Sequence, residues 1–330
     1  MKIFIYPTYD PKRDKSGNLY IDCFRKAFEA DPRFVVCNTW ARSETLGLLL
    51  NLRAELFILH WVDLIPSKPL GWLQTLFFRA GVCAARLRGA KIVWVLHNKE
   101  AHDDKSSRPA ALMQWMSGKA NYVLTHSQEG VTFFKQKYPR SRACCFFIPH
   151  PVYDSSEFRS GGPVMWDYII WGSISRRKNV LEFVRFAAGC NALKDKKIYI
   201  CGRCADSILD KEIRDALPPN VTFENRFMSD DELKEKISSA AAILFTYDGG
   251  SVLSSGALIY SLNFLKPIIG PRVGSFADMQ GIVSCYDSFE DIPSIPLSGD
   301  NSSLIKDYLA ENTWRSFPDK FLCHIGPTAR

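Results

Sequence analysis

The stretch Lys91-Ile-Val-Trp-Val-Leu-His97-Asn98 carries the pattern that decides the fold, an apolar run that ends on two polar residues. A short run of this kind is typical of a strand buried on both faces, as strands of parallel sheets are. Similar runs recur before and after it, separated by stretches with the spacing of amphipathic helices. This alternation predicts βαβ units and therefore parallel sheets.

The alternation is interrupted once. Pro149-His150-Pro151 opens a segment rich in Pro, Gly and Ser, which predicts a linker over residues 151–165. We therefore expect an α/β protein with two Rossmann-like domains, residues 1–150 and 166–301, that face each other across a cleft. Residues 302–330 are expected to form a C-terminal helix that crosses back to the N-terminal domain. Strands are expected at residues 3–6, 34–37, 56–60, 91–96, 122–125, 144–148, 168–171, 198–201, 221–224, 242–245, 267–270 and 282–285.

Composition fits a globular, cytoplasmic protein. The 330 residues are 46% hydrophobic and 23% charged, which suits two packed domains and argues against disorder. No secretory signal and no apolar run long enough to span a membrane are present. The ten cysteines are scattered, so we expect reduced, buried thiols. Cys201-Gly-Arg-Cys204 has redox or zinc spacing, but no second ligand pair lies nearby, which favours packing around a glycine turn.

The net charge of +7 resides in the first half of the chain. Residues 1–155 contain 22 Lys and Arg against 13 Asp and Glu, whereas residues 156–330 contain 20 against 22. This asymmetry indicates an anionic partner for the N-terminal domain. No nucleic-acid-binding motif accompanies it, so nucleic acid is not expected. The motifs G-x-G-x-x-G, G-x-x-x-x-G-K-[ST] and G-x-S-x-G are absent, which argues against dinucleotide, P-loop and α/β-hydrolase chemistry.

Histidines follow several strands of the first domain. His97 and Asn98 end one strand, and His102-Asp103 lies shortly after, so imidazole and carboxylate groups gather where a cleft site is expected. The alternative is that His97 and Asn98 only satisfy loop backbone groups. His126 ends the next strand before a predicted helix cap at Ser127, and His150 is held between two prolines.

Two segments of the second domain suit a phosphate group. Gly172-Ser173 follows the domain's first strand, and Arg177 and Lys178 stand just before a helix. An exposed basic turn is the alternative there. Further along, Ser254-Ser255-Gly256 opens a small-residue helix whose free amides would face an anion, and capping of an empty site is the alternative.

Taken in order, the motifs W-V-L-H-N…H-D, T-H-S, I-P-H-P-x-Y, G-S-I-x-x-x-K-N and S-S-G-A-L…P-I-I-G resemble GT-B glycosyltransferases. The resemblance spans nearly the whole chain and is strongest to bacterial members near glycosyltransferase family 4 that build exopolysaccharide, capsule or O-antigen. It implies a metal-independent enzyme without a cofactor, which transfers a sugar from a UDP- or GDP-sugar to a lipid-linked saccharide acceptor in cell-surface polysaccharide synthesis.

The resemblance also assigns roles. It implies that His97, His102 and Asp103 are catalytic, that Gly17, Asn18, Asn98, His126 and His150 bind the acceptor, and that Gly172, Ser173, Arg177, Lys178, Ser254, Ser255 and Gly256 bind the donor. Relatives often carry two Glu residues where this chain has Val252 and Tyr260, so the usual carboxylate for the ribose is missing. The alternatives are a nucleotide-sugar epimerase, which would form product without an acceptor, and a carbohydrate-binding protein, which would bind without turnover.

The segment from Leu64 to Lys99 contains six cations and no acid, interleaved with aromatic and leucine residues. A basic amphipathic helix of this composition fits the surface of an anionic membrane. The alternative is an ordinary basic helix that packs on the sheet. The prediction is therefore a cytoplasmic protein that docks peripherally on the inner face of the membrane.

Overall fold

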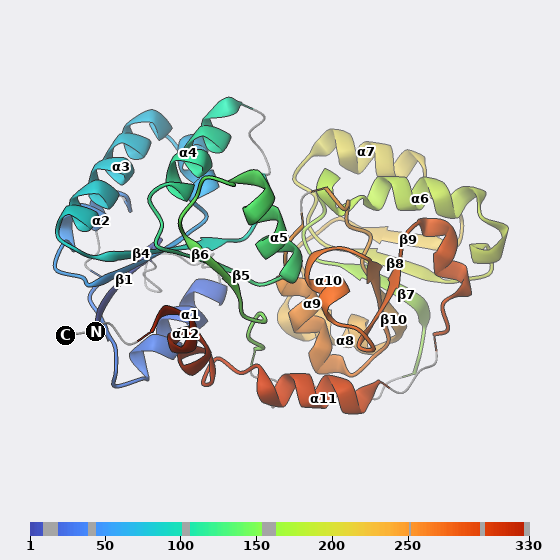
Figure 1. The fold of residues 1–330 in the computed structure, drawn as a ribbon. Helices are drawn as coiled ribbons and strands as arrows, with labels where there is room; N and C mark the ends of the chain where they lie inside the picture. The colour runs from blue at the N-terminus through green and yellow to red at the C-terminus, as the bar shows by residue number, and fades with distance from the viewer. Residues whose placement is uncertain are drawn as a thin grey trace. The chain divides into compact units, whose positions relative to one another are not determined.

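The computed structural model describes residues 1–8, 19–38, 44–100, 106–153, 163–250, 252–297 and 301–326. It divides into two compact units, the first comprising Met1–Pro151 and Asn312–Arg330 and the second Val152–Glu311. Most of the predicted linker, residues 154–162, lies outside the described residues. Each unit is built on its own parallel sheet (Figure 1).

The first unit contains a six-stranded sheet in the order β2-β1-β3-β4-β5-β6, and all five strand pairs are parallel. Its strands are β1 (Lys2–Tyr6), β2 (Val35–Val36), β3 (Leu56–His60), β4 (Lys91–Leu96), β5 (Tyr122–Thr125) and β6 (Cys144–Phe147). Its helices are α1 (Leu19–Glu29), α2 (Leu46–Leu50), η1 (Val62–Ser67), α3 (Gly71–Leu87), α4 (Ser107–Ser117), α5 (Gln128–Lys137) and α12 (Phe317–Ile325).

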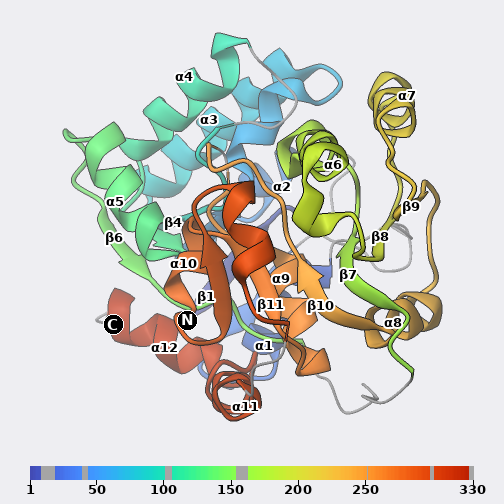
Figure 2. The same cartoon turned by 90° about the vertical axis from the view of Figure 1, so that its right-hand side faces the viewer.

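Both faces of this sheet are covered, which explains why its strands are apolar throughout. Alternate strand residues such as Ile3, Ile58 and Val93 pack with aromatic side chains of α1 and α12. The other set points to the opposite face, where the Tyr6 ring lies against Phe78 of α3. Figure 1 shows α1 and α12 on one side of the sheet and α3 and α4 on the other, and Figure 2 shows the same arrangement from the side.

The second unit repeats the plan with the strand order β12-β11-β10-β7-β8-β9, again wholly parallel. Its strands are β7 (Trp166–Trp171), β8 (Ile198–Cys201), β9 (Val221–Glu224), β10 (Ala240–Leu244), β11 (Ile268–Pro271) and β12 (Val283–Tyr286). Its helices are η2 (Arg176–Lys178), α6 (Val180–Gly189), η3 (Asn191–Leu193), α7 (Ser207–Asp215), α8 (Asp230–Ser238), α9 (Gly256–Ser261), η4 (Leu262–Phe264), α10 (Gly274–Asp278), η5 (Phe289–Ser294) and α11 (Ser302–Glu311).

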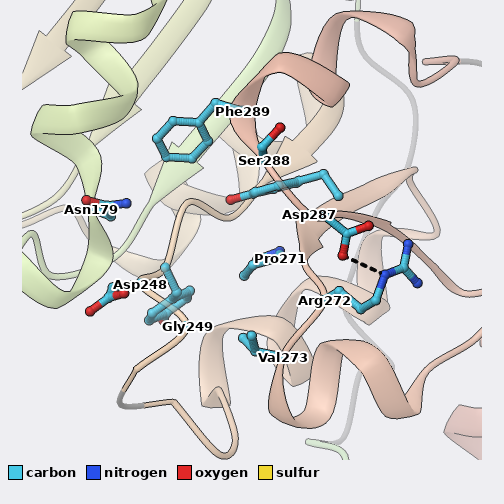
Figure 3. Close-up of a pocket in the computed structure, with 11 residues that line it drawn as sticks. Asn179, Asp248, Gly249, Pro271, Arg272, Val273, Asp287, Ser288 and Phe289 are labelled. Atoms are coloured by element: carbon cyan, nitrogen blue, oxygen red, sulfur yellow. Dashed lines mark hydrogen bonds and ion pairs between the residues drawn. The ribbon is translucent and has the colours of Figure 1, made fainter.

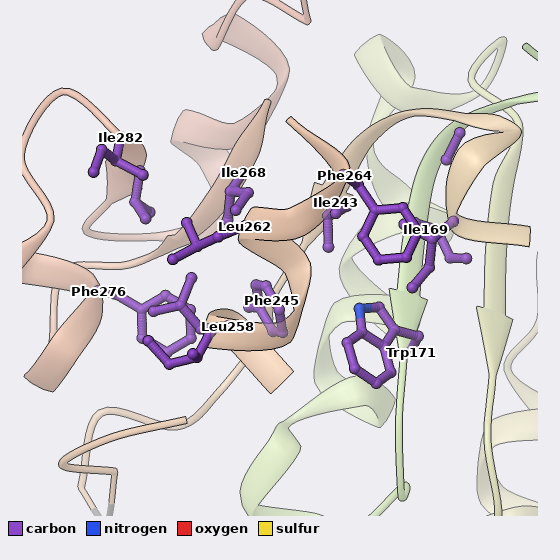
Figure 4. Close-up of a cluster of buried hydrophobic side chains, with 14 of the residues drawn as sticks. Ile169, Trp171, Ile243, Phe245, Leu258, Leu262, Phe264, Ile268, Phe276 and Ile282 are labelled. Atoms are coloured by element: carbon purple, nitrogen blue, oxygen red, sulfur yellow. The ribbon is translucent and has the colours of Figure 1, made fainter. Parts of the chain in front are cut away.

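Two apolar clusters sandwich the second sheet. One packs α6 and α7 on one face, and the other, shown in Figure 4, joins Trp171 and Phe264 to α8–α10 on the opposite face. Ile305 of α11 is fully buried in this second cluster. The chain therefore returns to the first unit only at Asn312, later than the boundary at residue 302 expected from the sequence, and the C-terminal segment is two helices rather than one.

In the Cys201-Gly-Arg-Cys204 segment the backbone after β8 passes close to the backbone after β7. Gly202 has φ +140°, and a Cβ atom there would lie 2.1 Å from the carbonyl oxygen of Gly172, so only glycine fits. Both cysteines are buried free thiols. Burial raises the pKa of Cys201 to about 12, with a smaller contribution from Glu224. A thiol held protonated in this way is a poor redox nucleophile.

Candidate functional site

Four histidines lie at the carboxyl ends of four neighbouring strands of the first sheet. His60 is the last residue of β3, His97 and His126 directly follow β4 and β5, and His150 comes shortly after β6. The ring of Tyr20, from α1, touches all of them, with centroid distances of 5.5, 5.2, 5.6 and 5.1 Å to His60, His97, His126 and His150. We call these five residues the histidine cluster.

Two members of the cluster are tied to the backbone. His126 Nδ1 donates to the carbonyl oxygen of Ile148 at 2.8 Å, so in the neutral ring its Nε2 is free to accept from the hydroxyl of Tyr20, 2.7 Å away. His150 Nδ1 likewise donates to the carbonyl oxygen of Pro151 at 2.8 Å. Both ring nitrogens of His126 are thus hydrogen-bonded within the protein. His126, a predicted acceptor residue, therefore also holds α1 and the segment after β6 together.

His97 is the partly exposed histidine of the cluster. Its Nε2 lies 3.0 Å from Nδ1 of the fully buried His60. The indole of Trp61 stacks on its ring, with centroids 4.6 Å apart and planes at 18°. The sequence analysis named His97 but overlooked His60, although the predicted strand 56–60 ends on that residue at the same edge of the sheet.

A buried carboxyl group lies beside this cluster. Asn98 Nδ2 donates to Oδ2 of Asp63, in η1, at 3.3 Å. Burial raises the pKa of Asp63 to about 6, although the bond from Asn98 opposes the shift. The sequence signal for Asp63 is weak, because it is a single acidic residue shortly after His60 and Trp61 and belongs to no motif. The predicted residues Gly17, Asn18, His102 and Asp103 lie outside the described residues.

Burial also decides the charge of the histidine cluster. It lowers the pKa of all four rings, to about 4 for His126 and about 3 for His150, and well below the usual range for His60 and His97. Mutual repulsion adds to this effect, because His97 is surrounded by the other three rings. At neutral pH the cluster is therefore uncharged, and His97 is available as a neutral base.

The second unit presents a cation at the corresponding edge of its own sheet. Lys178 has only 6% of its surface exposed, and its ammonium group turns back to donate to the carbonyl oxygen of Trp171, the last residue of β7, at 3.0 Å. A Cβ atom at Gly172 would lie 2.8 Å from this nitrogen, so the glycine leaves room for the cation. Among the described residues no carboxylate pairs with Lys178.

The three adjacent cations have different surroundings. Arg176 is held by Asp206 and Glu212, at 3.3 and 3.1 Å. Arg177 has no carboxylate partner within the described part of the chain, and its guanidinium group lies 5.9 Å from the centre of the Tyr247 ring. Among these three cations, Lys178 and Arg177 are therefore without a carboxylate partner in the described part of the chain, whereas Arg176 is already neutralised.

Tyr247 connects these cations to the other predicted phosphate segment, Ser254–Gly256. Its ring lies 5.4 Å from the Lys178 nitrogen, and its hydroxyl lies 3.1 Å from Oγ of Ser255. Burial alone would raise the pKa of Tyr247, but Lys178 and Ser255 outweigh it and the net shift is downward. Ser255 caps α9 by accepting from the amide of Leu258 at 3.2 Å.

A pocket of about 270 Å³ adjoins this group at the ends of β10, β11 and β12. Figure 3 shows its polar rim, with Asn179, Asp248 and Ser288 around the opening and Arg272 paired to Asp287 at 2.9 Å. Tyr247 and Phe289 supply aromatic surface. The backbone amide of Asp248, which lines the pocket, donates to the carbonyl oxygen of Arg177. This bond joins the pocket loop to the turn that contains the cations. Carboxylates, an amide and aromatic rings together suit a polar molecule with hydroxyl groups.

Neither a metal site nor a membrane span is found in the described part of the chain. No group of three or more His, Cys, Asp or Glu side chains there is arranged to hold a metal ion. No described helix combines the length and apolar character needed to cross a bilayer.

Comparisons with solved structures identify the architecture. Anabaena HepE, in complex with UDP and glucose, is 13% identical, with 98% of this chain and 99% of that chain covered and a TM-score of 0.64. The chain has the GT-B fold. AviGT4, a glycosyltransferase of avilamycin A biosynthesis, is 14% identical, with 99% and 98% covered and a TM-score of 0.62. Staphylococcus aureus TarM is 11% identical, with 86% and 58% covered and a TM-score of 0.60. No family model and no curated protein matches the sequence.

The buried histidines predict a specific response to acid. An unfolded histidine titrates near pH ~6.5, whereas the folded values of His126 and His150 are about 4 and 3. The contribution of the neutral rings to stability is therefore complete above pH ~6.5 and is lost as the pH falls below it. The free energy of unfolding should fall between pH ~6.5 and ~4, by up to ~1.4 kcal/mol per pH unit for each buried ring.

Urea unfolding measured at several pH values checks this prediction. His126→Asn should reduce the slope, because one titrating ring is gone. An identical slope in wild type and His126→Asn would contradict the assignment.

Proposed function

We propose that this protein is a glycosyltransferase that binds a nucleotide-sugar donor, UDP- or GDP-linked, in its second unit and a saccharide acceptor in its first. The observation that carries the proposal is the buried Lys178 cation, which lacks a carboxylate partner among the described residues and stands at the end of β7 in a GT-B fold. We further propose that the chain belongs near glycosyltransferase family 4, on the five ordered motifs of its sequence.

A buried cation is costly to desolvate unless an anion compensates it. The single carbonyl bond and the face of Tyr247 compensate Lys178 only partly, so a diphosphate beside it would gain a strong, charge-assisted contact. Arg177 and the amides of Ser254–Gly256 would reach the same group. The adjoining pocket, with Asp248 and Asn179 at its rim, would receive the hydroxyl-rich sugar of the donor.

Sugar transfer builds negative charge on the departing diphosphate, because the bond from the anomeric carbon to the phosphate oxygen breaks with its electron pair. Fixed cations placed where this charge develops lower the barrier and can take the place of a metal ion. We propose that Lys178 and Arg177 act in this way and that the reaction needs neither metal nor cofactor. Val252 and Tyr260 leave the ribose without the carboxylate seen in many relatives, so the diphosphate contacts must provide most of the donor affinity.

On the acceptor side we propose His97 as the base. It is the cluster histidine with an exposed edge, and burial keeps it neutral. Its task is to take the proton of the acceptor hydroxyl as that oxygen bonds to the anomeric carbon. Asn98, held by Asp63, would position the acceptor, with Gly17, Asn18, His102 and Asp103 as further candidates from the sequence.

A Lys178→Ala variant tests the donor site. We expect a higher donor KM and a loss of kcat/KM of about 10²-fold, the effect typical of removing one charge-stabilising donor. Nucleotide sugars and free nucleotides should raise the melting temperature of the wild-type protein, and this shift should shrink in the variant.

Arg176→Ala is the matched control for Lys178→Ala. It removes a cation from the same turn, but one already bound to Asp206 and Glu212, so donor affinity should stay near wild type. Equal losses in both variants would mean that net charge, not the position of Lys178, matters. Product that forms without any acceptor would point to an epimerase instead.

A His97→Ala variant tests the acceptor side. We expect kcat to fall by about 10²-fold or more, because a positioned base typically contributes that much, while the donor-induced melting shift is kept. Rapid transfer assays with saturating donor would measure this. Wild-type turnover in the variant would remove His97 from the mechanism.

We also propose that the acceptor is lipid-linked and that α3 docks on the anionic inner surface of the cytoplasmic membrane, as suits cell-surface polysaccharide synthesis. Trp72, Leu76, Arg79 and Leu87 recur at intervals that place them along one helix stripe, and all four are exposed. Arg86, Arg88 and Lys91 extend the exposed positive charge, whereas Lys68 and Lys99 are neutralised by Glu44 and Glu129.

Liposome sedimentation tests this surface. The protein should bind vesicles that contain anionic lipid, bind them less at high salt, and ignore vesicles of zwitterionic lipid alone. A Trp72→Ala, Leu76→Ala double variant should lose most of the binding and keep transfer to a water-soluble acceptor. Binding that is insensitive to salt or to this substitution would sink the proposal.

A further inference from the structure

Within the histidine cluster, the rings of His60 and His97 are in direct hydrogen-bond contact with each other. His60 Nδ1 and His97 Nε2 are 3.0 Å apart, a hydrogen-bond distance. The two rings are stacked, with centroids 5.3 Å apart. Phe24 packs edge-on against His60 at 4.7 Å, while Trp61 covers His97. His97 is therefore fixed in place by one directional bond and by aromatic packing.

The bond carries one proton, and its position decides what His97 can do. If His60 Nδ1 holds the proton, His97 must carry its own on Nδ1 and has no lone pair to offer outward. If His97 Nε2 holds it, His97 Nδ1 is a free lone pair. Nε2 of His60 is buried without a hydrogen-bond partner in the described structure, so neither arrangement completes the bonding of His60, and both remain accessible.

We propose that His60 is a positioning residue, which accepts the Nε2 proton of His97 and thereby leaves His97 Nδ1 free to act as the base. This inference rests on the proposed function and deepens it. The acceptor oxygen bonds to the anomeric carbon, its proton passes to His97 Nδ1, and the diphosphate leaves with the electron pair of the broken bond. The new imidazolium charge on His97 is then stabilised by the lone pair of His60.

The hydrogen-bond partner of His97 is an uncharged imidazole rather than a carboxylate, and this affects the pKa of His97. The groups that face it are His60 from β3, Tyr20 from α1, His126 after β5 and His150 after β6, all uncharged at neutral pH. A neutral imidazole fixes the tautomer as a carboxylate would, but it lacks the negative charge with which a carboxylate raises the pKa of the base. His97 thus stays unprotonated down to mildly acidic pH.

The experiment compares His60→Asn with His60→Leu, two side chains of nearly equal size and shape. The Asn Oδ1 atom takes the place of His60 Nδ1 and can accept the same bond, whereas Leu cannot. We expect His60→Asn to keep kcat within about threefold of wild type and His60→Leu to lose about tenfold or more, with donor KM unchanged in both. Equal kcat in the two variants, or a change confined to KM, would overturn the proposal.

Phe24→Leu serves as the packing control. It removes a buried ring in contact with His60 but leaves the bond to His97 in place, so it should lower stability and leave kcat and its pH profile unchanged. A loss of kcat matching that of His60→Leu would show that packing, not the hydrogen bond, supports His97.

Nitrogen-15 NMR of the histidine rings separates this inference from the proposed function. In the wild type His97 should carry its proton on Nε2, and His60→Leu should abolish that preference. If the tautomer is as expected but no nucleotide sugar is turned over, the transferase assignment fails and the role of His60 stands. If transfer depends on His97 but the tautomer of His97 is the same in wild type and in His60→Leu, the role of His60 fails and the transferase assignment stands.

Discussion

Parallel strand pairing is the constraint on which the rest of the structure depends. Because every strand in each sheet runs in the same direction, the residues that follow the strands all lie at the edge formed by the strands' carboxyl ends. In the first unit this rule alone gathers four histidines from positions 60 to 150 into one cluster. In the second it brings the Gly172–Lys178 turn beside the loop that contains Tyr247 and Ser255. The chemistry of both edges follows from the direction of the strands.

The two edges differ in charge. Desolvation keeps the histidine cluster neutral, since four imidazoles packed around Tyr20 cannot be protonated without repelling one another. The second unit instead buries a cation, Lys178, with only a carbonyl oxygen and an aromatic face to compensate it. The proposed glycosyl transfer relies on both groups: a neutral imidazole at one edge to remove a proton, and at the other edge a cation without a carboxylate partner among the described residues to stabilise a diphosphate.

Support for these groups comes from the residues packed against them. Gly202 allows β8 to approach Gly172 closely, and Gly172 leaves room for the Lys178 ammonium group. Asp63 holds Asn98, and His126 is locked between Tyr20 and Ile148. Arg176, adjacent to the candidate phosphate contacts, is withdrawn into ion pairs with α7 and its cap. Neighbouring residues with the same charge thus have different roles.

The sequence alone determined the fold class, the order of the strands along the chain and the candidate residues at strand ends, because apolar periodicity and turn residues act locally. It located β3, β4, β5, β8 and β9 to the residue, but β2, expected at residues 34–37, is only Val35–Val36, because only these two residues pair with β1. Only the tertiary structure decided that His60 is the partner of His97, that Asp63 is buried, and that Arg176 is ion-paired whereas Lys178 has no carboxylate partner among the described residues. Those facts arise from contacts between residues distant in sequence, and burial and pairing are properties that a linear pattern does not contain.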